Sequence, residues 1–270
     1  MRTTLAYIKR DILAYLKRLA YKPALPKNPM HDDIYLVEFP KSGVTWLSHI
    51  VGNIELQLRG MNETVTYYNH HRYVTDIHKV GGAAIHRKLD RTFIKSHSPY
   101  NPYYYFVVYL LRNPFDVMVS YYNYMTAHGV VMDFDAFVKS QRYGIPLWKA
   151  NVDGWLKSGL SDQKLHLMKY EALLIDPHGT VRDIYTEFGV TLDETVLNKA
   201  IELSDIGIMR KHEDHYRKFN PNYTLSFVGA KGKKSKDELL TDDIRTYISE
   251  QCRDILERYY PELLDQAWRK

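Results

Sequence analysis

Cysteine is almost absent from this chain of 270 residues. Cys252 is the only one, so no disulfide can form within the chain, and this composition favours a reducing compartment. It lies in a helix-like stretch near the C-terminus, and nothing around it in the sequence is typical of a nucleophile. We therefore interpret Cys252 as a structural residue.

Long hydrophobic runs are absent as well. No apolar run reaches the roughly 20 residues that a membrane-spanning helix requires. The N-terminus also lacks the uninterrupted apolar core of a secretion signal. We therefore expect a cytoplasmic protein.

A large charge of one sign is also missing. The formal net charge is +5, from 37 Lys and Arg against 32 Asp and Glu. This excess suits an anionic ligand or a membrane surface, but it is too small to indicate nucleic acid. The basic run KGKKSK (231–236) belongs to no recognisable nucleic-acid-binding module, and it fits a lid over a phosphate better. We expect no nucleic-acid partner.

The chain does contain 45% hydrophobic and 26% charged residues, a composition typical of a soluble globular protein with a substantial core. Residues 1–22 place leucine and isoleucine at helical spacing among arginines and lysines. Such a basic amphipathic helix either contacts the inner face of a membrane peripherally or packs on the domain with its basic face solvated, and both interpretations stay open. With the Pro-containing linker that follows, this segment covers 1–29, and we expect a single domain over 30–270.

Predicted strands and helices alternate along this domain. Apolar runs predict strands at 34–39, 92–96, 103–112 and 165–170, and helices at 45–58, 114–127 and from about Pro177. Asn113-Pro114 and Asp176-Pro177 each place a capping side chain before a proline at the first helical position. The alternation predicts an α/β fold, with a central parallel sheet flanked by helices.

The stretch FPKSGVTW (39–46) lies between the first predicted strand and the first predicted helix. Such a junction binds anions, because free backbone N–H groups and the positive end of the helix point there. Gly43 lets the backbone approach an oxyanion, while Ser42 and Thr45 offer hydroxyl donors. Lys41 precedes the glycine, whereas the ATP loop G-x-x-x-x-G-K-[ST] has its lysine after the second glycine. Considered alone, the stretch also fits an ordinary strand–turn–helix with an exposed lysine.

Four segments together resemble the cytosolic-type sulfotransferase family. FPKSGVTW is similar to its 5′-phosphosulfate-binding loop, and YLLRNPFDVMVSYYNY (109–124) resembles its 3′-phosphate-binding segment. FIKSHSPY (93–100) is similar to its catalytic-histidine segment, and KYEALLIDP (169–177) to its tyrosine segment. The matches follow the family's order from about residue 34 to 240. They imply the P-loop-NTPase-like sulfotransferase fold and 3′-phosphoadenosine 5′-phosphosulfate as the sulfuryl donor.

The resemblance implies in-line transfer of the sulfuryl group to an acceptor hydroxyl or amine. His97 would take the acceptor's proton as general base. Lys41 would stabilise the negative charge that grows on the leaving 5′-phosphate oxygen. Lys95 lies two residues before His97, so on a strand it points the same way and can face the transferring group. No metal is implied, because lysines and backbone amides supply the positive field.

The other implied contacts hold the donor nucleotide. Arg112 would grip the 3′-phosphate, with Ser120 two helical turns further on; considered alone, Arg112 also fits a salt bridge with Asp116. By resemblance Trp46 stacks on the adenine, while Tyr170 and Ser204 hydrogen-bond to it. The donor-binding residues that the resemblance implies are Lys41, Ser42, Gly43, Val44, Thr45, Trp46, Arg112, Ser120, Tyr170, Ser204, Lys231 and Gly232.

The chain departs from the family pattern in three places. Val44 replaces a loop threonine, which removes a hydroxyl and leaves the backbone N–H. In FVGAKGKKSKDEL (227–239), Ala230 stands for an arginine and Ser235 for a glycine of the family's closing segment. The donor's 3′-phosphate would then be held less tightly, or by other residues. The family's short dimerisation motif is not found, so a monomer and a homodimer both stay open.

The acceptor is a small molecule or a lipid whose identity the sequence leaves open. Tyrosines in and near the loops 60–91 and 125–150 favour an apolar alcohol, phenol, sterol or lipid over a highly charged glycan. They are Tyr67, Tyr68, Tyr103, Tyr104, Tyr122 and Tyr143. A glycan sulfotransferase stays an alternative, as do a nucleotide kinase on a similar scaffold and a relative that binds the nucleotide without chemistry. His70-His71 and the pair His212 and His215 lack the partners of a metal site, so we expect surface residues there.

Overall fold

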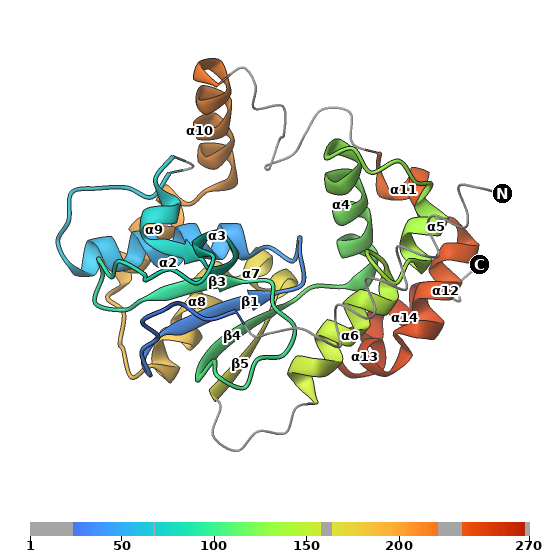
Figure 1. The fold of residues 1–270 in the computed structure, drawn as a ribbon, viewed down its shortest axis with the longest axis horizontal. Coiled ribbons are helices and arrows are strands. Elements are labelled where there is room, and N and C mark those ends of the chain that lie inside the picture. Colours follow the sequence, from blue (N-terminus) through green and yellow to red (C-terminus); the bar gives the residue numbers. More distant parts are fainter. Residues whose placement is uncertain (1–23, 67, 158–163, 221–233, 268–270) are drawn as a thin grey trace. The chain divides into compact units, whose positions relative to one another are not determined.

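The described part of the chain forms two compact units in this computed structural model (Figure 1). The sheet unit comprises described residues within 24–111 and 164–220, and the helical unit those within 112–157 and 234–267. The predicted N-terminal helix lies outside the described residues, and the single domain over 30–270 stays a prediction. The structure describes residues 24–66, 68–157, 164–220 and 234–267.

Five parallel strands form the sheet, in the order β2-β3-β1-β4-β5. Every residue of the central strand β1 is buried, as expected where both faces of a parallel sheet are covered. The predicted α/β fold is therefore confirmed, and the structure adds β2, whose three residues are too few to give a periodic signal. The strands are β1 (Ile34–Glu38), β2 (Val74–Asp76), β3 (Phe93–Ser96), β4 (Phe106–Leu111) and β5 (Lys164–Lys169).

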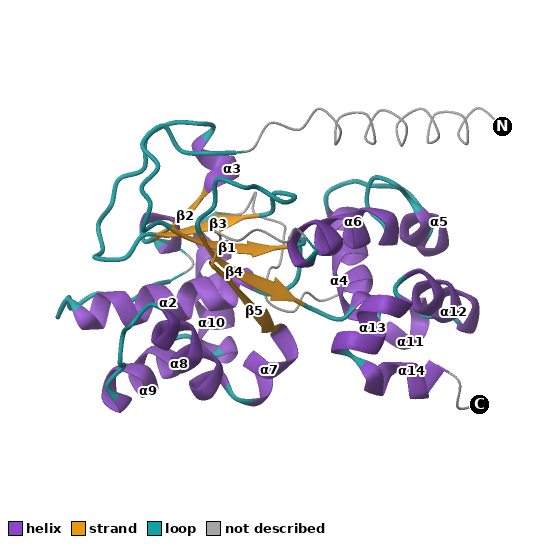
Figure 2. Cartoon of the chain, turned by 90° about the horizontal axis from the view of Figure 1, so that it is seen from below, coloured by secondary structure: helices purple, strands orange, loops and turns teal. Residues whose placement is uncertain are grey.

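Helices of the sheet unit share one apolar core with the strands. Figure 2 shows α2, α8 and α9 together on one face of the sheet. Leu36, Leu47, Val108, Ile184 and Leu197 are fully buried between them, and each such side chain contributes about 2 kcal/mol on burial. The helices are α2 (Val44–Leu58), η1 (His70–Arg72), α3 (Ile77–Val80), α7 (Tyr170–Ile175), α8 (Pro177–Glu187), α9 (Glu194–Leu203) and α10 (Ile206–Phe219).

The two predicted helix starts are confirmed by their caps. The side chain of Asn113 accepts a hydrogen bond from the N–H of Asp116 at 2.9 Å, where α4 begins. The side chain of Asp176 accepts one from the N–H of Gly179 at 2.8 Å, where α8 begins. Each cap satisfies a backbone donor that the helix itself leaves unpaired, and it is worth about 1 kcal/mol.

The helical unit has an aromatic core of its own. Phe137 stacks on Tyr143 with ring centroids 5.4 Å apart, and the edge of Tyr121 meets Phe137 at 5.6 Å. Cys252 is fully buried, and this burial raises the pKa of its thiol, which fits the structural role inferred from the sequence. The helices are α4 (Pro114–Ala127), α5 (Phe134–Lys139), α6 (Ile145–Leu156), α11 (Lys236–Leu239), α12 (Asp242–Gln251), α13 (Arg253–Tyr259) and α14 (Pro261–Ala267).

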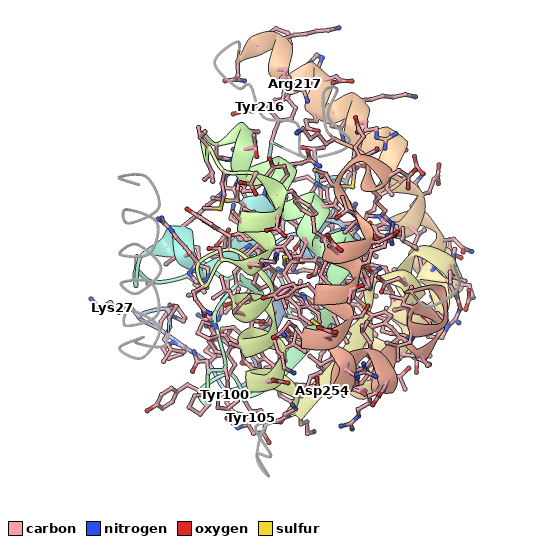
Figure 3. All side chains as sticks on the ribbon, turned by 90° about the vertical axis from the view of Figure 1, so that its right-hand side faces the viewer. Lys27, Tyr100, Tyr105, Tyr216, Arg217 and Asp254 are labelled. Atoms are coloured by element: carbon pink, nitrogen blue, oxygen red, sulfur yellow. The ribbon has the colours of Figure 1, made fainter. Side chains whose placement is uncertain are left out.

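An ion-pair network joins α6 to α13 in this unit. Asp254, labelled in Figure 3, accepts hydrogen bonds from Lys149 at 2.7 Å and from Lys157 at 2.9 Å. Partial burial alone would raise the pKa of Asp254, but these two lysines lower it to about 2. Among the described residues, no helix combines the length and apolarity needed to cross a lipid bilayer.

Glu55 of α2 is a carboxylate buried inside the sheet unit. Arg91 donates hydrogen bonds to both of its oxygens at 3.1 Å, and the hydroxyl of Tyr185 donates to Oε1 at 2.9 Å. Burial raises the pKa of Glu55, while Arg91 and Tyr185 act in the opposite direction. The carboxylate therefore depends on these partners to stay ionised in the core.

Replacing Arg91 with alanine removes the cation from this buried carboxylate. We expect the free energy of unfolding, measured by urea denaturation, to fall by about 3 kcal/mol. The control is Arg182→Ala, which breaks an ion pair with Glu194 between side chains that are 43% and 64% exposed. That variant should lose less than about 1 kcal/mol. Equal losses in both variants would contradict a special role for the buried pair.

Candidate active site

The loops that carry the predicted site follow neighbouring strands at one edge of the sheet. In the register of the strands, Val37 is level with Ser96, and Glu38 is level with Leu110. The strands run parallel, so the segments after β1, β3 and β5 all leave the sheet at its carboxyl edge. This edge is where ligands bind in open parallel sheets.

The phosphate loop, residues 39–43, turns sharply between β1 and α2. Lys41 and Gly43 have φ angles of 76° and 114°, both in the left-handed region. The N–H of Ser42 donates to the carbonyl of Phe39 at 3.2 Å, which closes the turn. The hydroxyl of Ser42 is buried and makes no hydrogen bond to any described residue. A buried, unpaired hydroxyl beside the N-terminus of a 15-residue helix fits an anion-binding loop.

Val44 opens α2 and serves this loop through its backbone. Its side chain is buried in the apolar core of the sheet unit, so it takes no part in polar contacts. Its N–H donates to Oε2 of Glu38 at 2.7 Å, in a buried hydrogen bond. The backbone N–H of the first residue of α2 is therefore already paired with a carboxylate of the chain itself.

His97 directly follows β3 and lies next to this loop. Its backbone N–H donates to Nε2 of His78 at 3.0 Å, and the two rings stack with centroids 6.1 Å apart. Burial holds the pKa of His97 well below its ordinary value of 6.5. The positive charge of Lys95 and the neighbouring His78 and Lys41 lower it further, against the backbone of Glu38, which raises it. His97 is therefore neutral at physiological pH.

Lys95 of β3 acts electrostatically on three imidazoles. Its charge lowers the pKa values of His49, His78 and His97, so the ammonium group is close to all three. His49 is itself buried on α2, where its Nδ1 hydrogen-bonds to the carbonyl of Thr45 at 2.7 Å, and burial lowers its pKa to about 4. The predicted catalytic residues Lys41, Lys95 and His97 are thus brought together.

The predicted adenine-binding residues also meet in the sheet unit. Trp46 Nε1 donates to the carbonyl of Ser204 at 2.9 Å, and the rings of Trp46 and Tyr170 meet edge to face at 6.3 Å. Ser204 is fully buried, and its hydroxyl accepts a hydrogen bond from Nδ2 of Asn53 at 3.0 Å. Asn53 was not predicted, because an asparagine inside a helix gives no signal of a partner 151 residues away.

Gly43 leaves no room for a side chain at this place. A Cβ atom on Gly43 would lie 2.3 Å from the ring of Tyr170, and the positive φ adds backbone strain. We expect Gly43→Ala to raise the Kd for the adenine nucleotide by at least about tenfold, since a shift of 1.4 kcal/mol suffices. Calorimetric titration with the nucleotide measures this.

The matched control for this change is Gly189→Ala. Gly189 also has a positive φ, 71°, but its substituent would meet nothing within 4 Å. The control therefore carries the backbone strain without the collision, and it should leave nucleotide affinity within about threefold. Equal weakening in both variants would show that general destabilisation, rather than the Tyr170 ring, is responsible.

The predicted 3′-phosphate residues belong to the helical unit. Arg112 lies 3.7 Å from Asp116, so the salt bridge considered from the sequence is present. Lys236 pairs with the same aspartate, and Asn123 of α4 exchanges two hydrogen bonds of 3.0 Å with the backbone of Lys234. Two basic residues of the altered closing segment, Lys234 and Lys236, thus lie against α4, the helix that also carries Ser120. Lys231 and Gly232 lie outside the described residues.

Besides Asn53, sequence reasoning missed three polar residues of the sheet-unit site, Glu38, His49 and His78. None of the three stands at a position of the four recognised motifs, so only their contacts single them out. Within the described ranges, no group of three histidine, cysteine or acidic side chains is arranged to hold a metal ion.

Comparison with known proteins decides the family. The profile of the sulfotransferase domain matches residues 31–267. The chain belongs to the sulfotransferase family. Sulfotransferase 2A6 of Mus musculus is 28% identical over 197 residues, which cover 67% of this chain and 67% of the relative. Cytosolic sulfotransferase 14 of Arabidopsis thaliana is 25% identical over 244 residues, which cover 76% and 69%.

Solved structures of sulfotransferases and related proteins share the fold. A retinol dehydratase in complex with androsterone and the inactive cofactor PAP matches with a TM-score of 0.59 at 16% identity, over 85% of this chain and 82% of that one. A mouse sulfotransferase complexed with PAP matches with a TM-score of 0.57 at 15% identity, over 89% and 90%. The resemblance expected from the four sequence segments is confirmed, and so is the sulfotransferase fold.

Proposed function

We propose that this sulfotransferase moves a sulfuryl group from 3′-phosphoadenosine 5′-phosphosulfate to the hydroxyl of an apolar acceptor. One observation carries the proposal: His97, whose pKa is lowered by burial and by its cationic neighbours Lys95 and Lys41, lies beside the loop at the N-terminus of α2. The PAP-bound structures of the two similar proteins support the choice of donor.

The donor's 5′-phosphate is proposed to bind at the N-terminus of α2. The buried hydroxyl of Ser42 and the backbone N–H groups of Gly43 and Thr45 would hold its oxygens, and Lys41 would carry the matching charge. The N–H of Val44 is already bonded to Glu38, so Val44 would contribute only its place in the loop. Trp46, Tyr170 and Ser204 would hold the adenine. When bound, this donor supplies an activated sulfuryl group whose leaving group is a phosphate.

Residues of the helical unit are proposed to bind the donor's 3′-phosphate. Arg112 is proposed to bind it bidentately, with Ser120 as a hydroxyl donor and Lys231 and Gly232 as contacts of the closing segment. Lys236 supports this assignment, because it neutralises Asp116 and so reduces the hold of that aspartate on Arg112. Its charge also offsets the arginine that Ala230 replaces.

His97 is proposed to accept the proton of the acceptor hydroxyl. As the acceptor oxygen forms its bond to sulfur, the bond between sulfur and the 5′-phosphate oxygen breaks, and the proton passes to the imidazole. Lys41 stabilises the charge that develops on the leaving oxygen, and Lys95 faces the transferring group. A neutral imidazole is the form that this step requires.

The acceptor is proposed to be an apolar alcohol, phenol, sterol or lipid. Tyr68 and Tyr103 are 37% and 68% exposed, so they are available to an apolar ring. Tyr104, Tyr122 and Tyr143 are buried and belong to the protein core, which corrects their proposed place in an acceptor site. Tyr67 lies outside the described residues. The androsterone-bound similar structure supports an apolar acceptor over a glycan.

The cellular location and the oligomeric state of the enzyme are proposed as follows. We propose a cytoplasmic enzyme, either a monomer or a homodimer, and the relative named a cytosolic sulfotransferase supports the compartment. Peripheral contact with a membrane would rest on residues 1–22, which lie outside the described residues.

Transfer of radioactive sulfate from the labelled donor into a mixed panel of sterols, phenols, lipid alcohols and glycans tests the proposal. Label in the apolar alcohols, unchanged by a metal chelator, is the expected result. Label in the glycans alone would overturn the proposed acceptor. Mg²⁺-dependent turnover of ATP without sulfate transfer would favour a nucleotide kinase. Tight PAP binding with no transfer to any acceptor would favour a binding protein.

A further inference from the structure

Glu38, the last residue of β1, lies between the phosphate loop and His97. Its side chain is 4% exposed, and Oε1 is 3.6 Å from Nδ1 of the His97 ring. Oε2 accepts the hydrogen bond from the N–H of Val44 at 2.7 Å. One buried carboxylate thus faces both the N-terminus of α2, which follows the phosphate loop, and the imidazole of His97.

We propose that Glu38 is the positioning residue of His97, holding Nδ1–H so that Nε2 is the atom that takes the acceptor's proton. This inference rests on the proposed function. A carboxylate beside one ring nitrogen fixes the tautomer and the orientation of an imidazole, and it stabilises the imidazolium that forms on proton transfer. The distance of 3.6 Å is just outside hydrogen-bond range, and a small rotation of the His97 ring would close the contact.

The charged groups around His97 explain why the imidazole needs a carboxylate beside it. Lys95 of β3, His78 of α3 and Lys41 of the phosphate loop all oppose protonation of the ring, as does its burial. A base that must carry a proton during the reaction needs one compensating negative charge, and the carboxylate of Glu38 lies at salt-bridge distance. The backbone of Glu38 acts in the same direction.

The hydrogen bond from Val44 fixes the carboxylate for this task. It holds Oε2 at the positive N-terminus of α2, which stabilises the negative charge of a buried side chain. With Oε2 held there, Oε1 stays turned toward His97. The same contact links the base to the loop that holds the donor, so both keep their geometry together.

Glu38→Gln tests this role, because glutamine keeps an oxygen for the Val44 N–H and loses the charge. We expect kcat to fall by at least about tenfold while the KM for the donor does not rise more than about threefold. The pKa of His97 should fall, because the imidazolium loses its negative neighbour, so the acidic limb of the kcat/KM profile should move to lower pH. Glu38→Asp keeps the charge on a shorter arm and should recover part of kcat.

Glu55→Gln is the matched control, since Glu55 is an equally buried glutamate of the same unit that contacts Arg91 and Tyr185 instead. It should lower stability but leave the acidic limb unmoved. If Glu38→Gln keeps kcat within about threefold and leaves the limb in place, the proposal is overturned. A fall in kcat together with a raised donor KM and an unmoved limb also overturns it, since Glu38 would then only shape the loop.

A readout without turnover separates this proposal from the proposed function. Nitrogen-15 NMR of the labelled wild-type protein reports which nitrogen of His97 carries the proton. The Nδ1–H tautomer, with a pKa that falls in Glu38→Gln, is expected whether or not sulfate is transferred. The Nε2–H tautomer in the wild-type protein would overturn the inference even if the enzyme is an active sulfotransferase.

Discussion

Replacing His97 with alanine is expected to lower kcat for sulfuryl transfer by about 10²–10⁴-fold, which is the usual contribution of a positioned general base. The backbone N–H that bonds to His78 is retained in this variant, so the end of β3 should keep its course. No donor contact is assigned to the ring, and the Kd for PAP should therefore stay within about threefold. Steady-state kinetics and calorimetric titration with PAP measure the two quantities.

The control for this experiment is His166→Ala. His166 lies on β5, where its ring pairs with Glu187 at 2.8 Å, apart from the residues of the proposed site. It should keep kcat within about threefold. If His97→Ala retains more than a tenth of the wild-type kcat, His97 is not the base, and a water molecule or another side chain takes the proton.

The pH dependence of the wild-type enzyme follows from the same residue. Burial and the charges of nearby lysines depress the pKa of His97 well below 6.5. The ring is therefore neutral at pH 6.5 and above. A base works while neutral, so kcat/KM should be level at neutral pH and fall only well below pH 6.5. This acidic limb should be missing from the residual activity of His97→Ala.

Lys41→Met is the second change with a large expected effect, a fall in kcat of about 10²–10³-fold. Methionine keeps most of the length of the side chain and removes its charge. The charge on the leaving phosphate oxygen grows as the reaction proceeds, so the loss should be larger in kcat than in donor binding. The donor KM should still rise, because Lys41 also pairs with the 5′-phosphate in the ground state.

Lys199→Met provides the control for removing one lysine charge. Lys199 lies on α9 and pairs with Glu202 at 3.0 Å on the surface, with half of its side chain exposed. Its kcat and donor KM should match the wild type within about twofold. A Lys41→Met enzyme whose kcat is unchanged while KM rises would show that the lysine binds the donor without assisting its cleavage.

The sequence by itself determined the parts of this protein that depend on neighbours along the chain. Continuous apolar runs produce buried parallel strands, and Asn113 and Asp176, each followed by a proline, cap the helices that begin there. The phosphate loop also belongs here, because a glycine turn between a strand and a helix fixes its own backbone. Lys41 and Ser42 could therefore be predicted at a strand–helix junction from sequence alone, and the four matching segments together led to the prediction that this junction binds an anion.

Tertiary structure decided the contacts that join distant segments. The contact between Glu38 and His97 depends on β1 and β3 lying side by side, and an acidic residue at the end of an apolar run does not predict its partner. The hydrogen bond between Asn53 and Ser204 spans 151 residues and exists only because α2 and α9 share a core. Tyr104 was predicted to supply an aromatic ring to the acceptor site, but in the structure it stacks on Tyr35 and is fully buried in the interior. Side-chain identity sets what a residue can do, but packing alone sets what it meets.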